Sequence, residues 1–110
     1  MINYKSGDNK TLNTEEKIYR KLLEVPPGYV TTYGELAKSI NLKNGQRAVG
    51  QIMKKNPFPV IIPCHRVVKS DGTIGGYAYG ADIKKNMLTK EGLQIDADKI
   101  LDFKNNLFRF

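Results

Sequence analysis

The sequence predicts a mainly α-helical domain with a small β-hairpin, in the layout of a winged helix-turn-helix. Three observations support this class: apolar residues recur at helical spacing, two short helical segments are joined by a brief polar connection, and an Asp-Gly turn lies between two β-rich segments. The chain has 110 residues, which is enough for one domain. We expect residues 1–13 to form a flexible N-terminal end and residues 14–110 to form that domain.

The first helix is predicted to begin near Thr14. Asn13 or Thr14 can cap it, and two glutamates follow in the first turn, where they favour the positive end of the helix dipole. A Pro-Pro-Gly sequence at 26–28 ends the helix. The buried stripe of this helix is formed by Ile18, Leu22 and Val25.

A helix-turn-helix is predicted over residues 32–55. Its first helix begins with Thr32 and Glu35 at the spacing of a capping box. A polar turn follows, and a second helix is expected over 46–55, ended by Asn56 and Pro57. The buried side of that second helix is formed by Val49, Ile52 and Met53.

The second half of the chain begins with an apolar segment, 58–68, that is too rich in proline for a helix. The sequence predicts buried extended chain there, followed by a hairpin around the Asp-Gly turn at 71–72. A glycine-containing loop at 75–80 can approach a flat ligand closely. A last main helix is expected over about 82–91 with three inward residues, and one more turn of helix in the tail. The inward residues are Ile83, Met87 and Leu88, and those expected to cover the core from the tail are Ile100, Leu101 and Phe103.

The composition favours a polyanionic partner. The net charge is +7, and residues 17–69 carry ten basic residues against two acidic ones. A basic protein with no nucleic-acid partner fits the charge alone about equally well. One cysteine and one histidine cannot build a structural zinc site or an internal disulfide, so no metal is predicted. The longest apolar stretch is too short to cross a membrane, and we expect a cytoplasmic, reducing location.

Cys64 is the candidate nucleophile. A thiol reacts as the thiolate and needs a neighbouring group that takes its proton. His65 is the only histidine, but in extended chain adjacent side chains point to opposite faces, so adjacency alone does not pair them. Taken alone, a cysteine of this kind is more often an inert buried residue.

The surrounding motifs add a specific resemblance. The sequence resembles the O6-alkylguanine-DNA alkyltransferases, also called methylated-DNA–protein-cysteine methyltransferases, over about residues 15–92. The matching motifs are TTYGELA at 31–37, QRAVG at 46–50, NP at 56–57, IIPCHRVV at 61–68, GY at 76–77 and EG at 91–92.

The resemblance implies a reaction that each molecule performs once and that needs no cofactor. The Cys64 thiolate attacks the alkyl carbon on O6 of guanine and keeps the alkyl group as a thioether. By the same resemblance, His65 is the base acting through a bridging water, Glu91 holds His65, and Tyr33 donates toward N3 of the guanine. Asn56 is implied to tie the active-site turn to the recognition helix, and the alternative is a simple helix stop.

The implied partner is double-stranded DNA bearing O6-alkylguanine, bound by a monomer through the minor groove with the damaged base flipped out. Arg47 is implied to fill the space that the base leaves, while the small residues Ala48 and Gly50 let the helix lie close. Thr32 and Lys54 complete the expected DNA-binding set. The expected pocket residues are Val67, Tyr77, Ala78, Tyr79 and Lys84.

Two of these pocket residues carry separate expectations. Tyr79 stands where some relatives have a small residue, and we expect it to disfavour bulky benzyl-type adducts. Lys84 aligns with a lysine near the pocket, but because Lys85 is its neighbour, a solvated helix face is nearly as good an interpretation for either.

Three functions fit the sequence. The first is the alkyl-accepting repair protein, as a catalytic domain without the N-terminal domain that family members generally carry. The second is a non-catalytic lesion binder similar to the alkyltransferase-like proteins, which share the short length but lack the acceptor thiol. The third is a winged-helix transcription regulator, which would not explain the Pro-Cys-His-Arg segment at 63–66.

Overall fold

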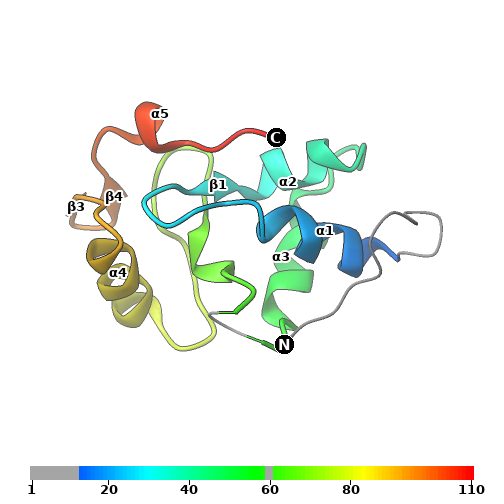
Figure 1. Ribbon diagram of the computed structural model, residues 1–110, viewed down its shortest axis with the longest axis horizontal. Helices are drawn as coiled ribbons and strands as arrows, with labels where there is room; N and C mark the ends of the chain where they lie inside the picture. The colour runs from blue at the N-terminus through cyan, green and yellow to red at the C-terminus, as the bar shows by residue number, and fades with distance from the viewer. Residues whose placement is uncertain (1–12, 59–60) are drawn as a thin grey trace.

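The computed structural model describes residues 13–58 and 61–110. Helices α1, α2 and α3 gather at one end of the molecule, and α4 with β3 and β4 lies at the other, with β1 between them (Figure 1). The elements are α1 (Thr14–Leu22), β1 (Thr31–Thr32), α2 (Tyr33–Ser39), α3 (Gln46–Lys54), the 3-10 turn η2 (Cys64–Arg66), β2 (Val67–Val68), α4 (Ala81–Lys90), β3 (Ile95–Asp96), β4 (Lys99–Ile100) and α5 (Phe103–Asn106).

The first helix begins and packs as the sequence predicts. Asn13 is the N-cap, and its Oδ1 accepts a hydrogen bond from the backbone N–H of Glu16 at 2.9 Å. On the buried side, the Tyr19 hydroxyl donates to the carbonyl of Ile52 at 3.0 Å, which ties α1 to α3. The core between these helices includes Ile18, Leu22, Val25, Leu36, Val49, Ile52 and Met53.

The helix-turn-helix is formed by α2 and α3. Thr32 caps α2, because its Oγ1 accepts from the backbone N–H of Glu35 at 3.0 Å. The turn closes through Gly45, where a Cβ would lie 2.6 Å from Leu42 Cγ and 3.0 Å from Ala37 Cβ. Only glycine therefore lets α3 start this close to α2.

The strands pair differently from the prediction. β1 pairs in parallel with β2, and the antiparallel hairpin is formed by β3 and β4. The hairpin predicted around residues 71–72 is reduced to a tight turn, which the backbone N–H of Lys69 closes by donating to the Thr73 carbonyl at 2.9 Å. The chain does turn there, with Gly72 at φ +88°, but on one side Val67–Val68 pairs with β1, and on the other Thr73 bridges to Lys99. Local turn chemistry specified the turn but not the partners of the flanking segments.

A second core lies under α4. It consists of Val30, Val68, Ile74, Leu88, Leu93 and Ile100. The prediction that Ile83 faces inward is wrong, since its side chain is 47% exposed, while the neighbouring Lys84 is fully buried. Lys84 and Leu88 lie one helical turn apart and share the buried face. Leu101, also expected to cover the core, is exposed at 46%.

Candidate active site

The segment that carries Cys64 is a tight turn. Extended chain was predicted, but Cys64–Arg66 forms one turn of 3-10 helix, in which the backbone N–H of Arg66 donates to the Pro63 carbonyl at 2.9 Å. This turn sends the two neighbouring side chains to different places. Cys64 lies at a cavity, while His65 reaches the end of α4.

The cavity has a volume of about 380 Å³ and lies between α3, the N-terminus of α2 and the loop before α4. Cys64 is only 6% exposed, so its thiol is reached through this cavity. The lining residues are Tyr33, Gly50, Met53, Lys54, Cys64, Gly76, Tyr77 and Ala78. The wall is mostly apolar with two phenols and one thiol, which suits a flat ligand of mixed polarity.

Behind the cavity wall, His65 forms a hydrogen bond with Glu91. His65 is 1% exposed, and its Nε2 lies 2.9 Å from Glu91 Oε2. An ionised carboxylate can only accept, so Nε2 carries the hydrogen and Nδ1 has the free lone pair. Nδ1 is buried and has no hydrogen-bond partner among the described residues. The imidazole is thus oriented as a base.

The surroundings of His65 favour its neutral form. Burial lowers the pKa of His65 below its usual 6.5, Glu91 opposes this change, and the positive charges of Arg66 and Lys84 add to it. Burial raises the pKa of Glu91, but hydrogen bonds from Arg66 and His65 outweigh burial, so its pKa lies below the usual value. At neutral pH the pair is therefore a neutral imidazole beside a carboxylate.

Lys84 is a buried cation beneath the pocket. Its Nζ donates to the carbonyl of Val67 at 2.7 Å and to that of Gly76 at 3.0 Å. Burial lowers its pKa to about 8, and negative charge on Cys64 acts in the opposite direction. The solvated-face interpretation is therefore wrong for Lys84, whereas Lys85 lies at the surface with Nζ 3.6 Å from Asp98.

The two phenols of the cavity have raised pKa values. Burial, and secondarily a charge on Cys64, raises the pKa of Tyr33. Burial raises the pKa of Tyr77 to about 12, with Cys64 and Tyr79 adding to the effect. Both phenols are therefore neutral hydrogen-bond donors at physiological pH.

Asn56 connects α3 to the active-site segment. Its Nδ2 donates to the carbonyl of Ile62 at 2.9 Å, and its Oδ1 accepts from the backbone N–H of Phe58 at 2.9 Å. The residue follows α3 directly, so it also marks the helix end. A residue that only ended the helix would not account for the side-chain hydrogen bond to the Ile62 carbonyl.

The residues expected to contact DNA fall into two groups. Arg47, Ala48 and Lys54 are exposed on α3, and nothing lies within 4 Å of a Cβ placed on Gly50. Thr32 differs, because it is 5% exposed and its hydroxyl caps α2. Its side chain is used by the fold, and a DNA contact by Thr32 stays a prediction.

The expected pocket residues also divide. Tyr77 and Ala78 line the cavity, whereas Val67 and Lys84 are buried beneath it. Tyr79 is 56% exposed, is absent from the lining, and meets Tyr77 edge to face with ring centroids 5.6 Å apart. It can influence the cavity only through Tyr77 in this structure. Arg66 is not among the residues predicted for the site, but it contacts Glu91; the only sequence signal for it is its place in the Pro-Cys-His-Arg segment.

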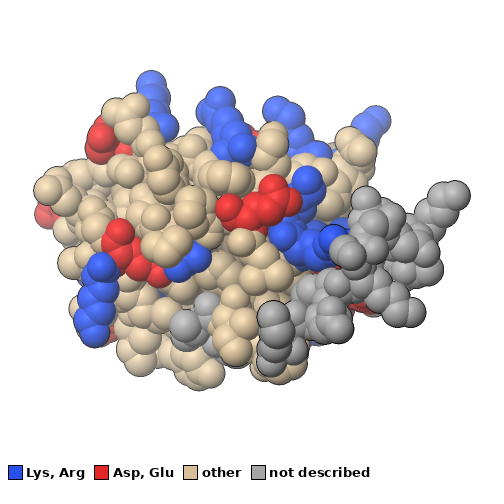
Figure 2. All heavy atoms as spheres, in the orientation of Figure 1, with Lys and Arg blue, Asp and Glu red and all other residues tan. Residues whose placement is uncertain are grey.

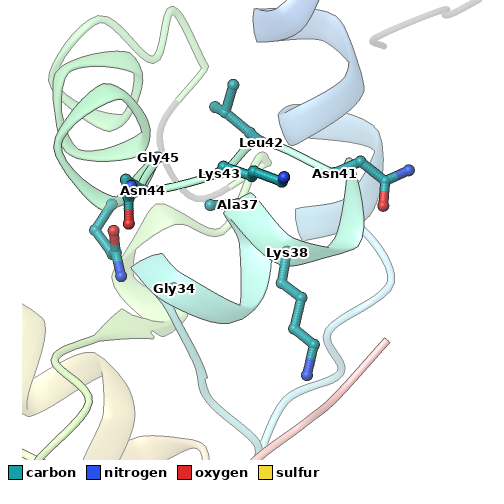
Figure 3. A pocket seen from close by; sticks show the side chains of 9 residues that line it. Gly34, Ala37, Lys38, Asn41, Leu42, Lys43, Asn44 and Gly45 are labelled. Carbon is teal, nitrogen blue, oxygen red and sulfur yellow. The ribbon is translucent and has the colours of Figure 1, made fainter.

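A separate hollow of about 400 Å³ lies along α2 and the turn before α3, where the labelled side chains do not converge on one point (Figure 3). Its lining contains lysines and amides but no nucleophile or carboxylate. On the face shown in Figure 2, Lys and Arg side chains gather along one edge and one side of the molecule, with Asp and Glu between them. Of these two hollows, only the cavity at Cys64 is lined by a nucleophile.

Within residues 13–58 and 61–110, no group of three or more His, Cys, Asp or Glu side chains is placed to hold a metal ion. In the same part of the chain, no helix has the length and apolar character needed to cross a bilayer.

The fold and the site together define a helix-turn-helix protein with a cysteine in a cavity beside its second helix. Residues 13–93 match the family described as 6-O-methylguanine DNA methyltransferase, DNA binding domain. The chain belongs to this family.

Curated relatives agree with this assignment. The methylated-DNA–protein-cysteine methyltransferase of Pyrobaculum aerophilum is 52% identical over 71 residues, which are 64% of this chain and 47% of the relative. The protein of the same name from Thermococcus kodakarensis is 49% identical over 81 residues, covering 73% of this chain and 45% of the relative. The chain thus spans about half the length of the curated relatives it matches.

Solved structures with similar folds include complexes with DNA. The Mycobacterium tuberculosis OGT complex with DNA has a TM-score of 0.70 at 35% identity, covering 73% of this chain and 50% of that one. S. pombe Atl1, in complex with damaged DNA containing O6-carboxymethylguanine, has a TM-score of 0.73 at 30% identity. That match covers 88% of this chain and 95% of Atl1. The mainly helical fold with small sheets is confirmed by these structures.

Proposed function

We propose that this chain repairs duplex DNA by taking the alkyl group of O6-alkylguanine onto Sγ of Cys64, once per molecule. The observation that carries the proposal is the position of the cysteine: its thiol lies at a cavity beside α3, and an oriented His65–Glu91 pair lies behind it. Solved structures with similar folds include complexes with DNA. The chain would act as a monomer on double-stranded DNA.

Proton removal is the first step. The thiol proton passes to Nδ1 of His65, directly or through a bridging water, and the Nε2–H bond to Glu91 stabilises the resulting imidazolium. Lys84 favours the thiolate that remains, since opposite charges at Cys64 and Lys84 attract. No metal or cofactor is needed for this step.

Alkyl transfer follows as a displacement at carbon. A carbon–sulfur bond forms at Cys64 while the bond between that carbon and O6 breaks, and its electron pair stays on the guanine. Tyr33 lines the cavity as a neutral phenol and can donate toward N3 of the departing base, which reduces the charge that develops there. The departing base is a guanine anion, which takes up one proton, balancing the one that the thiol gave to His65, and becomes unmodified guanine; the other product is the thioether at Cys64.

The target base must leave the stack before it can reach Cys64, at a cost of a few kcal/mol. Arg47 is exposed near the start of α3 and can occupy the space that the base leaves, while Ala48 has no long side chain to hold α3 away from the groove. Lys54 lies at the cavity and is exposed, so it can contact a phosphate of the flipped nucleotide. We expect affinity for duplex DNA to fall steeply with salt.

The decisive experiment measures the mass of the intact protein after incubation with a duplex that contains one O6-methylguanine. We expect one methyl group per protein, mapped to the peptide that contains Cys64, and none with an undamaged duplex. Cys64→Ser is the matched variant, and we expect it to bind the damaged duplex without gaining mass. Wild-type protein that remains unmodified after long exposure to excess damaged DNA under reducing conditions contradicts the proposal.

A second candidate function is non-catalytic lesion binding. It is favoured by the match to Atl1, of which this chain covers 95%, in a complex with damaged DNA. The two candidates differ in the same mass measurement. A lesion binder would retain the damaged duplex more tightly than the undamaged one while its mass stayed constant.

A further inference from the structure

Arg66 makes three hydrogen bonds around the proposed base, although the reaction described above gives it no part. Its Nε donates to Glu91 Oε1 at 2.9 Å and its Nη2 to Glu91 Oε2 at 2.6 Å. Its Nη1 donates to the carbonyl of Val25 at 2.9 Å, in the connection between α1 and β1. One planar guanidinium therefore joins η2, the end of α4 and the segment after α1.

This arrangement fixes the carboxylate of Glu91 at both oxygens. Oε2 accepts from Arg66 and also from Nε2 of His65, which lies 2.9 Å away. A carboxylate held by a two-point contact cannot rotate without breaking both bonds to the guanidinium. The oxygen that faces His65 is therefore held in position by Arg66.

We propose that Arg66 is a positioning residue for alkyl transfer: it holds the Glu91 carboxylate in place, so that His65 keeps its hydrogen on Nε2 and a free lone pair on Nδ1. The inference rests on the proposed function, because it assigns His65 the role of base. Arg66 acts only through Glu91 and His65. It is half-buried and does not line the cavity, so it does not touch the alkylated base.

The electrostatics agree with the geometry. Besides Glu91, the groups that act on His65 are the charges of Arg66 and Lys84 and the ring of Tyr77, whose centroid is 6.4 Å from that of His65. Burial lowers the pKa of His65 most, Glu91 raises it, and Arg66 is among the charges that lower it. Without the guanidinium, Glu91 would pair with His65 alone. The imidazolium would then be stabilised, and the base would be protonated at higher pH.

The chain offers a direct test, because it contains a single histidine. Imidazole resonances in an NMR titration therefore report on His65 without assignment. In Arg66→Met we expect the titration midpoint to rise by roughly one pH unit, the lower end of what one nearby charge does. Arg66→Lys keeps the positive charge but not the two-point contact with Glu91. Its titration midpoint should lie between those of the wild type and Arg66→Met. In the wild type, the ¹⁵N shifts of the neutral ring should report the Nε2–H tautomer.

Arg109→Met is the matched control. It removes another arginine that contacts a carboxylate, Glu35 at 3.3 Å, but this arginine is exposed and the His65 midpoint should not move. Melting temperature and amide spectra establish that each variant is folded. If Arg66→Met fails to fold, the His65 midpoints of Arg66→Lys and Arg66→Gln are compared with that of the wild type instead. A midpoint in the folded charge-loss variant that is equal to or below the wild-type value overturns the inference.

A second measurement separates this inference from the proposed function. The single-turnover rate of methyl transfer is measured against pH for wild type and Arg66→Met. We expect the acid limb of the rate profile to move to higher pH in parallel with the NMR midpoint. Absence of any methyl transfer in the wild type refutes the proposed function alone, since the NMR titration still tests Arg66. Transfer with an unchanged acid limb and an unchanged midpoint refutes the role of Arg66 alone.

Discussion

The burial of Lys84 predicts an unusual dependence of stability on pH. Its ammonium is fully buried and donates to the carbonyls of Val67 and Gly76. Burial lowers its pKa from 10.5 to about 8, so the native state releases this proton before the unfolded state does. Two hydrogens remain on the neutral amine, so both bonds to carbonyls can persist after deprotonation.

The sign follows from proton linkage. Below pH 8 Lys84 is protonated in both states and adds no pH dependence. Between pH 8 and 10.5 the unfolded state binds more protons, so the free energy of unfolding rises with pH. Above 10.5 the contribution is constant. At about 1.4 kcal/mol for each pH unit, the full rise is roughly 3 kcal/mol.

The assay is urea unfolding at a series of pH values, with Lys84→Met compared to its parent. Both proteins carry Cys64→Ser, which removes the thiol and its oxidation. Because a charge on Cys64 raises the pKa of Lys84, this background can only enlarge the effect. The tyrosines titrate in both proteins, so their contribution cancels in the difference. Lys85→Met removes the neighbouring surface lysine and is the matched control for loss of a positive charge.

The quantity that decides is the difference in free energy of unfolding between parent and Lys84→Met. We expect it to shift in favour of the parent by roughly 3 kcal/mol from pH 8 to pH 10.5. Its absolute value at pH 7 is not part of the prediction, because methionine removes both a desolvation cost and two hydrogen bonds. If this difference in free energy of unfolding does not change between pH 8 and 10.5, the Lys84 ammonium is not desolvated in the folded protein. That result would refute the reasoning.

Three further changes test other contacts. Asn56→Ala removes one of the two hydrogen bonds that the Ile62 carbonyl accepts, the other coming from the backbone N–H of Cys64, and should cost about 1 kcal/mol in urea unfolding, whereas an unchanged free energy of unfolding would mean that this tie is dispensable. Thr32→Ala removes a helix cap and should cost about 1 kcal/mol, while the affinity for duplex DNA at fixed salt should not change; a weaker affinity in the folded variant would identify Thr32 as a DNA contact. Arg47→Ala should slow methyl transfer roughly tenfold or more because base flipping is impaired, and Gln51→Ala, exposed on the same helix, should not.

Helix positions could be predicted from the sequence because their signals are local. Asn13 and Thr32 cap the helices that the spacing of polar and apolar residues predicts. The buried residues of α3 match the predicted stripe, and α1 matches it at Ile18 and Leu22; Tyr19, also buried, was not predicted, and Val25 is buried beyond the end of the helix. These features depend on residues within a few positions of each other, so they can be read without knowledge of the rest of the fold.

Strand pairing and the orientation of α4 depend on distant residues. Thr31 pairs with Val67, thirty-six positions away, and no local pattern specifies that register. The error at Ile83 has a related cause. Its apolar side chain suggested the inner face, but the carbonyls that satisfy Lys84 come from β2 and from the loop before α4. A buried lysine is predictable only when its acceptors are known.

The candidate site was predicted mainly through the resemblance, and the structure adds the contacts that the motifs do not contain. Cys64 and Tyr33 both line the cavity, and His65 and Glu91 form a hydrogen bond across 26 positions of sequence. Arg66 was missed because its partners, Glu91 and the Val25 carbonyl, are remote in sequence. Adjacency of Cys64 and His65 could not show which way each side chain points, and the 3-10 turn decides it.

The connections around the site are made largely by polar side chains rather than by sheet. Each strand is two residues long, so the ladders supply few backbone hydrogen bonds. Instead, Asn56 holds the Ile62 carbonyl, Arg66 holds that of Val25, and Lys84 holds those of Val67 and Gly76. The two cations that tie these loops are also the charges that lower the pKa of His65. Changes at Arg66 or Lys84 should therefore affect stability and reactivity together, and only the pH dependence separates the two effects.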